Sequence, residues 1–285
     1  MAEAVDLSQL AAPDVVETLD YEVILAARVA KMKEELAAAG ILPDWDPSLE
    51  SDTIVKLLQE SAYREMIMRG RINDAARAVM LAFSTGTNLD HLAAFYGVAR
   101  LPGENHDRLR MRAQMALEGF TTAGPKKAYR FHALSADVRV KDVSVTSPQP
   151  GDVMITVLST DGDGTASIDL QAIVLAALDD EEIRPLCDTV LVQSATIIPY
   201  QITAALRLFS GPDEAAILAA AETKARKYAD TCHALGALVA MSGLDAALHQ
   251  TGVEKVNLSL PAAEIAPDSV TAAYCTAITV SKADG

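Results

Sequence analysis

The sequence predicts an α+β protein, with an N-terminal helical region followed by two small α+β modules with mostly antiparallel sheets. Three observations predict this fold class. Apolar residues recur at helical spacing early in the chain, whereas valine-rich runs with strand-like spacing begin near residue 138. Alanine-rich helical stretches separate the later runs, which is typical of sheets covered by helices. We expect an arm and helix at 1–47, a central helical region at 48–123, and modules at 124–198 and 199–285.

The N-terminal residues 1–13 favour an extended arm, which is either a frayed terminus or a segment that docks on a neighbouring subunit. Residues 14–39 follow as a helix that ends at Gly40. Its apolar positions cover more than one narrow stripe, so we expect this helix to contact two surfaces. Pro43, Trp45 and Pro47 then form a stiff connector, and core or interface packing is the usual role of such a tryptophan.

The candidate subunit-interface residues come from this arm, helix and connector. They are Leu7, Leu10, Val16, Leu19, Val23 and Trp45. The connector and the later Pro199 are also candidate hinges.

The stretch from Ser51 to Gly97 holds the longest helical pattern, and we expect the chain to be organised around it. Asp52 or Ser51 can cap its first turn, and Gly86 can end it in the left-handed conformation. The apolar stripe is Ile54, Leu58, Ala62, Met66, Ala76, Met80 and Phe83, widened by Leu57, Ile72 and Val79. Glu–Arg pairs at 60/64 and 65/69 support the exposed face. A second short helix is expected at 88–96, and a further one at 105–118.

The second half of the chain predicts strands joined by helices. A hairpin is expected at 138–145 and 152–158, a helix capped by Ser167, and a strand at 189–198 that Pro199 separates from the next. The remaining elements are a helix from 210 to 230, a short helix at 242–250, and strands at 253–260 and 270–280. A weak repeat of helix, strand, proline turn and strand indicates two similar modules.

Patterns that would carry catalysis are missing. No serine lies in a Gly-x-Ser-x-Gly turn, and Lys126–Lys127 lacks the glycine pattern of a phosphate loop. The run 179–182 is interpreted as a solvated helix end, because an acid/base pair needs carboxyl groups in different environments. The four arginines at 100, 108, 110 and 112 could bind an anion, although pairing with local acidic groups is the more common outcome. We therefore predict no enzyme and no catalytic residue.

Metal and cofactor sites are not predicted either. The DGDG motif at 161–164 resembles the start of a calcium loop, but Thr165 and the missing closing glutamate favour Asx turns. A zinc site from Cys232, His233, His249 or Cys275 would require the fold to gather them, and buried thiols with ordinary imidazoles are the alternative.

The composition limits the partners. The formal net charge is −15, and such an acidic protein repels phosphate backbones, so nucleic-acid binding is not expected. No apolar run is long enough for a bilayer, and the N-terminus lacks a signal-peptide pattern. Three separated cysteines fit a reducing compartment. We expect no membrane partner and synthesis in the cytoplasm.

Long phrases of the chain resemble the baseplate assembly protein J family of contractile-tailed bacteriophages. The phrases are DLSQLAAPDVVETLDYEVILA, YREMIMRGRINDAARAVMLAFSTGTNLDHLAAFYGVAR, EGFTTAGPKKAYRFHALSADVRVKDVSVTSPQPGDVMITVLS and AAYCTAITV. The resemblance implies a structural wedge protein of the virion tail baseplate, assembled in the host cytoplasm, that helps transmit the contraction trigger. Related proteins occur in contractile injection systems, so a baseplate component outside a phage is an alternative, as is a cell-wall hydrolase of the tail.

The same resemblance implies several partners. Two copies of the chain would join a small lysozyme-like-fold wedge protein, and further copies would close a six-fold ring around the central hub and spike proteins. The N-terminal helices would bundle with a tail-fibre-connecting baseplate protein, and the α+β modules would contact other copies.

Overall fold

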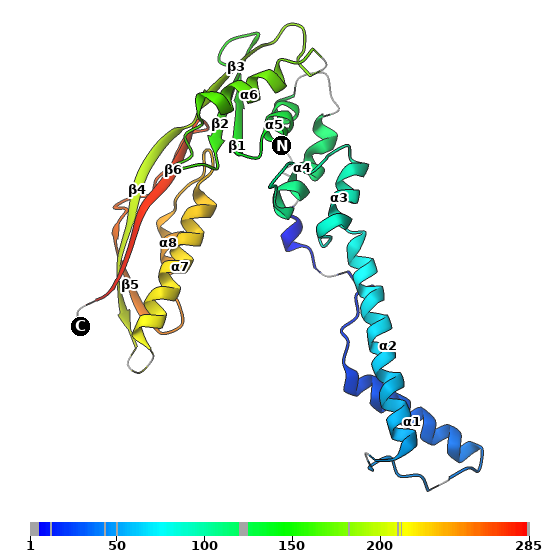
Figure 1. The fold of residues 1–285 in the computed structure, drawn as a ribbon. Helices are drawn as coiled ribbons and strands as arrows, with labels where there is room; N and C mark the ends of the chain where they lie inside the picture. Colours follow the sequence, from blue (N-terminus) through cyan, green and yellow to red (C-terminus); the bar gives the residue numbers. More distant parts are fainter. Residues whose placement is uncertain are drawn as a thin grey trace. The chain divides into compact units, whose positions relative to one another are not determined.

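The computed structural model describes residues 6–11, 13–42, 44–49, 51–119, 125–181, 183–209, 211 and 213–283 (Figure 1). The chain divides into two compact units. The first contains residues 1–100 and 106–113, and the second contains residues 101–105 and 114–285. Each unit is described separately below.

The first unit is helical. Its elements are the 3₁₀ turn η1 (Leu7–Gln9), α1 (Tyr21–Ala38), α2 (Thr53–Ala78), α3 (Gly86–Phe95) and the first part of α4 (His106–Gly119). The prediction that the first helix starts at residue 14 is wrong. It starts at Tyr21 because the Asp20 side chain accepts hydrogen bonds from the main-chain N–H groups of Glu22 and Val23, which makes Asp20 the N-cap.

The helix α2 begins where the sequence indicates, since Asp52 accepts from the N–H of Ile54 at 2.7 Å. It ends at Ala78, before the predicted end near Ser84. Beyond Ala78 the chain changes to three-residue hydrogen bonds, such as Phe83 N–H to the Met80 carbonyl at 3.0 Å, and it therefore turns before α3.

The first α+β module opens the sheet-containing part of the second unit. It comprises α5 (Lys126–Ala136), β1 (Val140–Thr146), β2 (Asp152–Ser159), α6 (Ile168–Leu178) and β3 (Thr189–Ser194). β1 and β2 form the predicted antiparallel hairpin, and β3 pairs with β2 in parallel. The Ser167 hydroxyl accepts from the Leu170 N–H at 3.2 Å and caps α6 as predicted.

The second α+β module comprises β4 (Thr196–Leu208), α7 (Glu214–Cys232), α8 (Met241–Leu248), β5 (Val253–Leu260) and β6 (Thr271–Lys282). Its strand order is β5-β4-β6, with β5 antiparallel and β6 parallel to β4. Both helices lie on the same side of this sheet (Figure 1). The core between them contains Ile202, Leu206, Ala225, Leu244 and Leu248, all almost fully buried.

The α+β fold class is therefore confirmed, but the sheets are mixed and not mostly antiparallel. In each described sheet the central strand has one antiparallel and one parallel neighbour. The parallel strand arrives after helices, because a parallel connection needs a crossover, whereas a tight turn gives an antiparallel hairpin. The predicted repeat is wrong in the second module for this reason: β5 and β6 do not pair with each other, since β4 lies between them.

The predicted break at Pro199 is also wrong. β3 ends at Ser194, β4 starts at Thr196, and Pro199 lies inside β4 opposite Tyr274 of β6. A strand tolerates proline where its N–H would not be needed for pairing. β5 pairs with β4 only from Thr203 onward, so Pro199 lies where that side of β4 has no β5 partner. A paired strand position is unsuited to a hinge, and Pro43 of the other hinge candidate lies outside the described residues.

Candidate assembly surface

The helices α1 and α2 pack against each other through a small apolar core. Trp45, Val55 and Leu58 are buried there. The partly buried residues around them are Leu25, Val29, Met32, Leu36 and Ile54. The Trp45 indole N–H donates to the Asp52 carboxylate at 2.9 Å, so the connector is fixed to the cap of α2. One stripe of each helix is used in this contact.

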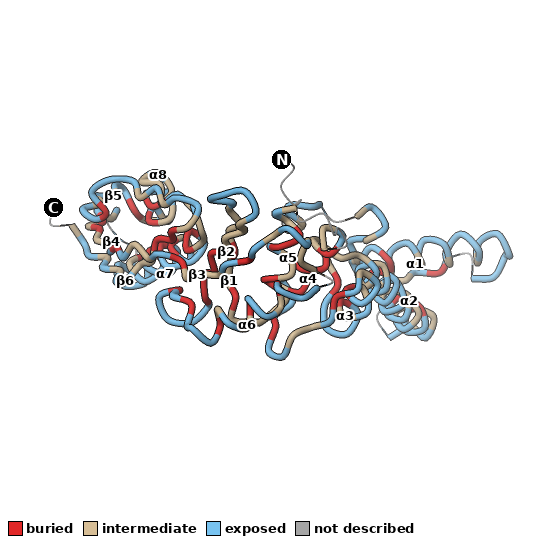
Figure 2. Tube along the Cα trace, turned by 90° about the horizontal axis from the view of Figure 1, so that it is seen from above, coloured by how far each residue is buried: buried red, intermediate tan, exposed pale blue. Residues whose placement is uncertain are grey.

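The outer faces of the two helices are exposed and contain many apolar side chains. Figure 2 shows α1 and much of α2 as exposed along their lengths, and Ile24 is the one residue of α1 that is buried. Val23, Leu57, Met68, Ile72 and Val79 are between 59% and 70% exposed. Full burial of such a side chain contributes about 1.5–3 kcal/mol. Apolar groups gathered on one surface mark an interaction site.

Two open grooves follow this helix pair. The first, of about 270 Å³, is lined by Val23, Ile24, Ala27, Arg28, Lys31, Glu65 and Arg69. The second, of about 390 Å³, is lined by Arg28, Ser61, Arg64, Glu65, Met68, Arg69 and Ile72. Apolar side chains in a groove with charged groups beside them have the composition of a protein–protein interface.

Three charged side chains line both grooves and contact one another: Arg28, Glu65 and Arg69. Arg28 Nε donates to Glu65 Oε2 at 2.7 Å and its Nη1 donates to the Ser61 hydroxyl at 2.6 Å. Arg69 Nη2 lies 2.7 Å from Glu65 Oε1. The hydrogen bond from Arg28 holds the pKa of the Glu65 carboxyl below its usual value, and the charges of Arg28 and Arg69 act in the same direction. Glu65 therefore joins α1 to α2 as a carboxylate.

The stretch before α1 also lies on α2. The buried Asn73 side chain accepts from the Glu17 N–H at 3.0 Å and donates to the Glu17 carbonyl at 2.9 Å. Arg69 Nη1 lies 3.1 Å from the Glu17 carboxylate. The residues before the first helix thus contact their own chain at Glu17. Sequence reasoning missed Asn73, although a polar residue three positions before Ala76 on the apolar stripe was an available signal.

The six candidate interface residues differ in what they offer to a neighbour. Leu10 is 47% exposed and Val23 is 65% exposed, whereas Leu7, Val16 and Leu19 are half-buried. Trp45 is 8% exposed and packs within the α1–α2 core of its own chain. The exposed α2 residues Leu57, Met68 and Ile72 join the candidate surface in its place.

Three arginines of the predicted basic cluster, Arg100, Arg110 and Arg112, contact groups of their own unit. Arg100 Nε donates to Asp90 at 2.7 Å. Arg110 donates to the carbonyls of Leu81 and Ser84 at 2.8 and 3.0 Å and to Asp107 at 2.7 Å. The contacts of Arg110 hold the segment that follows α2 against α4. The ion pairs with Asp90 and Asp107 agree with the prediction that these arginines pair with nearby acidic groups.

The cysteine and histidine residues considered as zinc ligands make other contacts in the structure. Cys232 is buried in the core beside Leu244, Cys275 is half-buried, and the His233 ring points to main chain of the first α+β module. In the DGDG loop Asp163 accepts from the Thr165 N–H at 3.0 Å, which is the predicted Asx turn. Within the described part of the chain, no three histidine, cysteine, aspartate or glutamate side chains gather as a metal-binding group.

Membrane-spanning helices were also considered. Among the described residues, no helix is long and apolar enough to cross a membrane.

Three known protein domains and one curated protein are similar to this chain. Residues 50–107 match the Baseplate J-like N-terminal domain, residues 121–194 the Baseplate J-like central domain, and residues 200–281 the Baseplate J-like protein C-terminal domain. The chain is 46% identical over 293 residues to "Baseplate protein J" of Escherichia phage P2, covering 95% of both chains. It belongs to the baseplate J family.

A solved structure gives a more distant match to this baseplate J-family chain. It is a chain of the cryo-EM structure of the anti-feeding prophage (AFP) baseplate, six-fold symmetrised, with a TM-score of 0.44 and 16% identity. The match covers 62% of the present chain and 43% of the AFP chain, so less than half of that longer protein corresponds to it.

Proposed function

We propose that this chain is a structural wedge subunit of a contractile-tail baseplate and has no catalytic role. The observation that supports this most strongly is the 46% identity to protein J of phage P2 along 95% of both chains. Family membership extends over all three J-like domains, so the proposal concerns the whole chain.

The proposed docking surface is the outer face of α1 and α2. Its centre is Val23, Met68 and Ile72 beside the two grooves, with the Arg28–Glu65 pair as a polar border. A helix with an apolar face fits such a groove, because its apolar side chains can enter at positions one turn apart. The proposed occupant is a helix of the tail-fibre-connecting baseplate protein or of a second copy of this chain.

We propose further contacts with other baseplate proteins, without assigning them to particular residues. The small lysozyme-like-fold wedge protein and the central hub and spike proteins are proposed neighbours, and the α+β modules are proposed to contact further copies in a ring. In this arrangement the subunit assembles in the host cytoplasm, remains in the virion tail, and passes the contraction trigger to its neighbours through these contacts. Apolar surface left exposed in the isolated subunit would supply the driving force for assembly.

Hydrogen exchange on the isolated subunit and on assembled tails tests the proposal. We expect amides of α1 and α2 to exchange at least tenfold more slowly in the tail, because docking covers both outer faces. The central strand β4 serves as an internal control, since its main chain is already paired with β5 and β6 in the isolated subunit. Equal exchange of α1 and α2 in the two states would contradict the proposed surface.

A further inference from the structure

The two α+β modules of the second unit meet at a polar contact centred on His233. This residue follows α7 in the second module. Its Nε2 lies 3.1 Å from the main-chain oxygen of Asp163, and its Nδ1 lies 2.8 Å from Lys141 Nζ. Both partners belong to the first module. Two residues later the Leu235 N–H donates to the Asp142 carboxylate at 3.1 Å, again across the junction.

With Lys141 as an ammonium, these distances fit one protonation state of the ring. Burial lowers the pKa of Lys141, and the carboxylates of Asp230 and Asp142 oppose this effect. A carbonyl oxygen only accepts, so Nε2 must carry the hydrogen that is donated to Asp163. The ammonium of Lys141 only donates, so Nδ1 must offer its lone pair. Both bonds exist together only when His233 is neutral. A protonated ring would place an N–H and a positive charge 2.8 Å from a second cation.

We propose that the contact between the two α+β modules is a latch, closed by neutral His233 and opened when this ring is protonated. Among the described residues, a small apolar cluster lies at the junction: Leu158, Ala195 and Ala272 are buried, with Ile197 and Leu235 packed beside them. Two of those buried side chains are alanines, which bury little surface. In this proposal the polar contacts decide whether the modules stay together.

The charged groups around His233 act in opposite directions. Burial and the nearby Lys141 lower the pKa of His233, whereas the Asp163 main chain and the carboxylates of Asp230 and Asp163 raise it. The aromatic ring of Tyr274 on β6 lies 5.2 Å from the His233 ring. The lowering influences dominate. The latch is then fully closed above the ordinary histidine pKa of about 6.5, and it weakens as the pH falls below that value.

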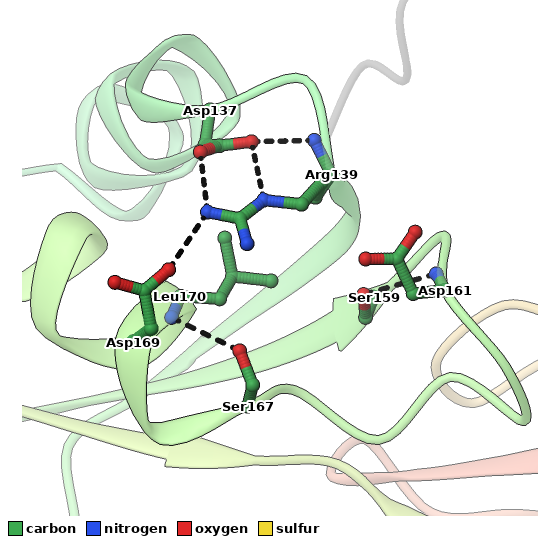
Figure 3. Close-up of polar contacts among 7 residues, drawn as sticks. All are labelled: Asp137, Arg139, Ser159, Asp161, Ser167, Asp169 and Leu170. Atoms are coloured by element: carbon green, nitrogen blue, oxygen red, sulfur yellow. Dashed lines mark hydrogen bonds and ion pairs between the residues drawn. The ribbon is translucent and has the colours of Figure 1, made fainter.

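Figure 3 shows polar contacts at both ends of the first-module loop that carries Asp163. Within the loop before α6, the Ser159 hydroxyl accepts from the Asp161 N–H at 3.0 Å. Arg139 binds Asp137 and also reaches Asp169 in the first turn of α6 at 3.0 Å. Because the loop is held at both ends, we expect protonation to break the contact instead of shifting it.

Spin-label distances in the full chain test the latch. One nitroxide is attached at Ala176→Cys on α6 and one at Lys255→Cys on β5, with Cys187→Ser and Cys275→Ser removing the other accessible thiols. We expect a single narrow distance distribution at pH 8 and one at least twice as broad at pH 5. An unchanged distribution at pH 5 would overturn the proposal.

Two further variants separate His233 from other groups. His233→Gln should abolish the pH dependence, and His132→Gln should leave it intact. His132 is a suitable control because it is also partly buried but bonds to the Gly119 carbonyl at the end of α4, and not to the second module. A pH response that persists in His233→Gln would contradict the latch.

NMR titration of the histidine rings provides a readout that does not depend on those variants. We expect the neutral His233 ring to carry its hydrogen on Nε2. Lys141→Met should raise the His233 pKa toward about 6.5, because the opposing cation is removed. An Nδ1–H tautomer, or a His233 pKa that does not change in Lys141→Met, would exclude the proposed chemistry.

Discussion

Asn73 binds the main chain of Glu17 in both directions, with its amide nitrogen 2.9 Å from the carbonyl oxygen and its amide oxygen 3.0 Å from the nitrogen. Asn73 lies in α2, and Glu17 lies in the irregular stretch before α1. A single side chain thus replaces the pairing that this stretch lacks in secondary structure.

Replacing Asn73 by alanine should release this stretch. The Glu17 N–H and carbonyl lose their partners, which costs about 1–3 kcal/mol for two hydrogen bonds of ordinary strength. Urea denaturation followed by Trp45 fluorescence should show the loss, and residues 13–20 should exchange faster. Asn88→Ala on the exposed start of α3 is the matched control. If both variants were equally stable, the two hydrogen bonds would have no role in stability.

The Trp45 side chain should report on the α1–α2 contact, because it is the only tryptophan of the chain. Trp45→Ala should cost about 3–5 kcal/mol through the cavity that it leaves. Trp45→Phe keeps most of the packing and loses the bond to Asp52, so about 1 kcal/mol is expected. Circular dichroism during urea unfolding measures both. Equal losses would show that the packing of the ring is unimportant.

Two glycines of one loop provide a test of the module junction. Gly164 has φ of +100°, and a Cβ there would lie 2.7 Å from His233 Nε2 and 2.6 Å from Leu158 Cδ1. Gly162 has φ of +60° with nothing within 4 Å of a Cβ. Gly162→Ala should cost about 1 kcal/mol for the left-handed backbone. Gly164→Ala should cost a further amount of about 1–3 kcal/mol from overpacking. Thermal unfolding compares them, and equal stability would argue against a close contact.

The contact between α1 and α2 should weaken in acid through Glu65. Its pKa is lowered in the folded chain, so its contribution is complete above the ordinary value of about 4.3 and is lost as the pH falls below that value. Glu65→Gln should flatten the dependence of the urea midpoint on pH between about 6 and 3. Glu60→Gln, in the exposed pair with Arg64, should leave the dependence as it is. A steep profile in Glu65→Gln would point to another carboxylate.

Features that depend on neighbours in the sequence could be predicted well. The caps at Asp52 and Ser167, the strand β5 and the hairpin of β1 and β2 follow from local hydrogen bonding and spacing. Local signals also misled. The helix expected from residue 14 begins at Tyr21 instead, because the Asp20 side chain caps it.

Features that depend on distant residues could not be predicted. The insertion of β4 between β5 and β6 is a choice among sheet orders that hydrophobic spacing leaves open. Lys141 and His233 are separated by 92 positions, and neither belongs to a motif, so their contact required the fold. The exposed apolar face of α2 could be predicted in part. Leu57, Ile72 and Val79 make its apolar stripe wider than the contact with α1 requires, and all three are exposed.

A cryo-EM structure of an assembled tail that contains this chain would show whether the outer face of α1 and α2 is an interface. We expect the side chains of Val23, Met68 and Ile72 to contact a helix from another polypeptide within about 4 Å. If these three side chains faced solvent in the assembled baseplate, the outer face of α1 and α2 would not be the surface through which the subunit assembles.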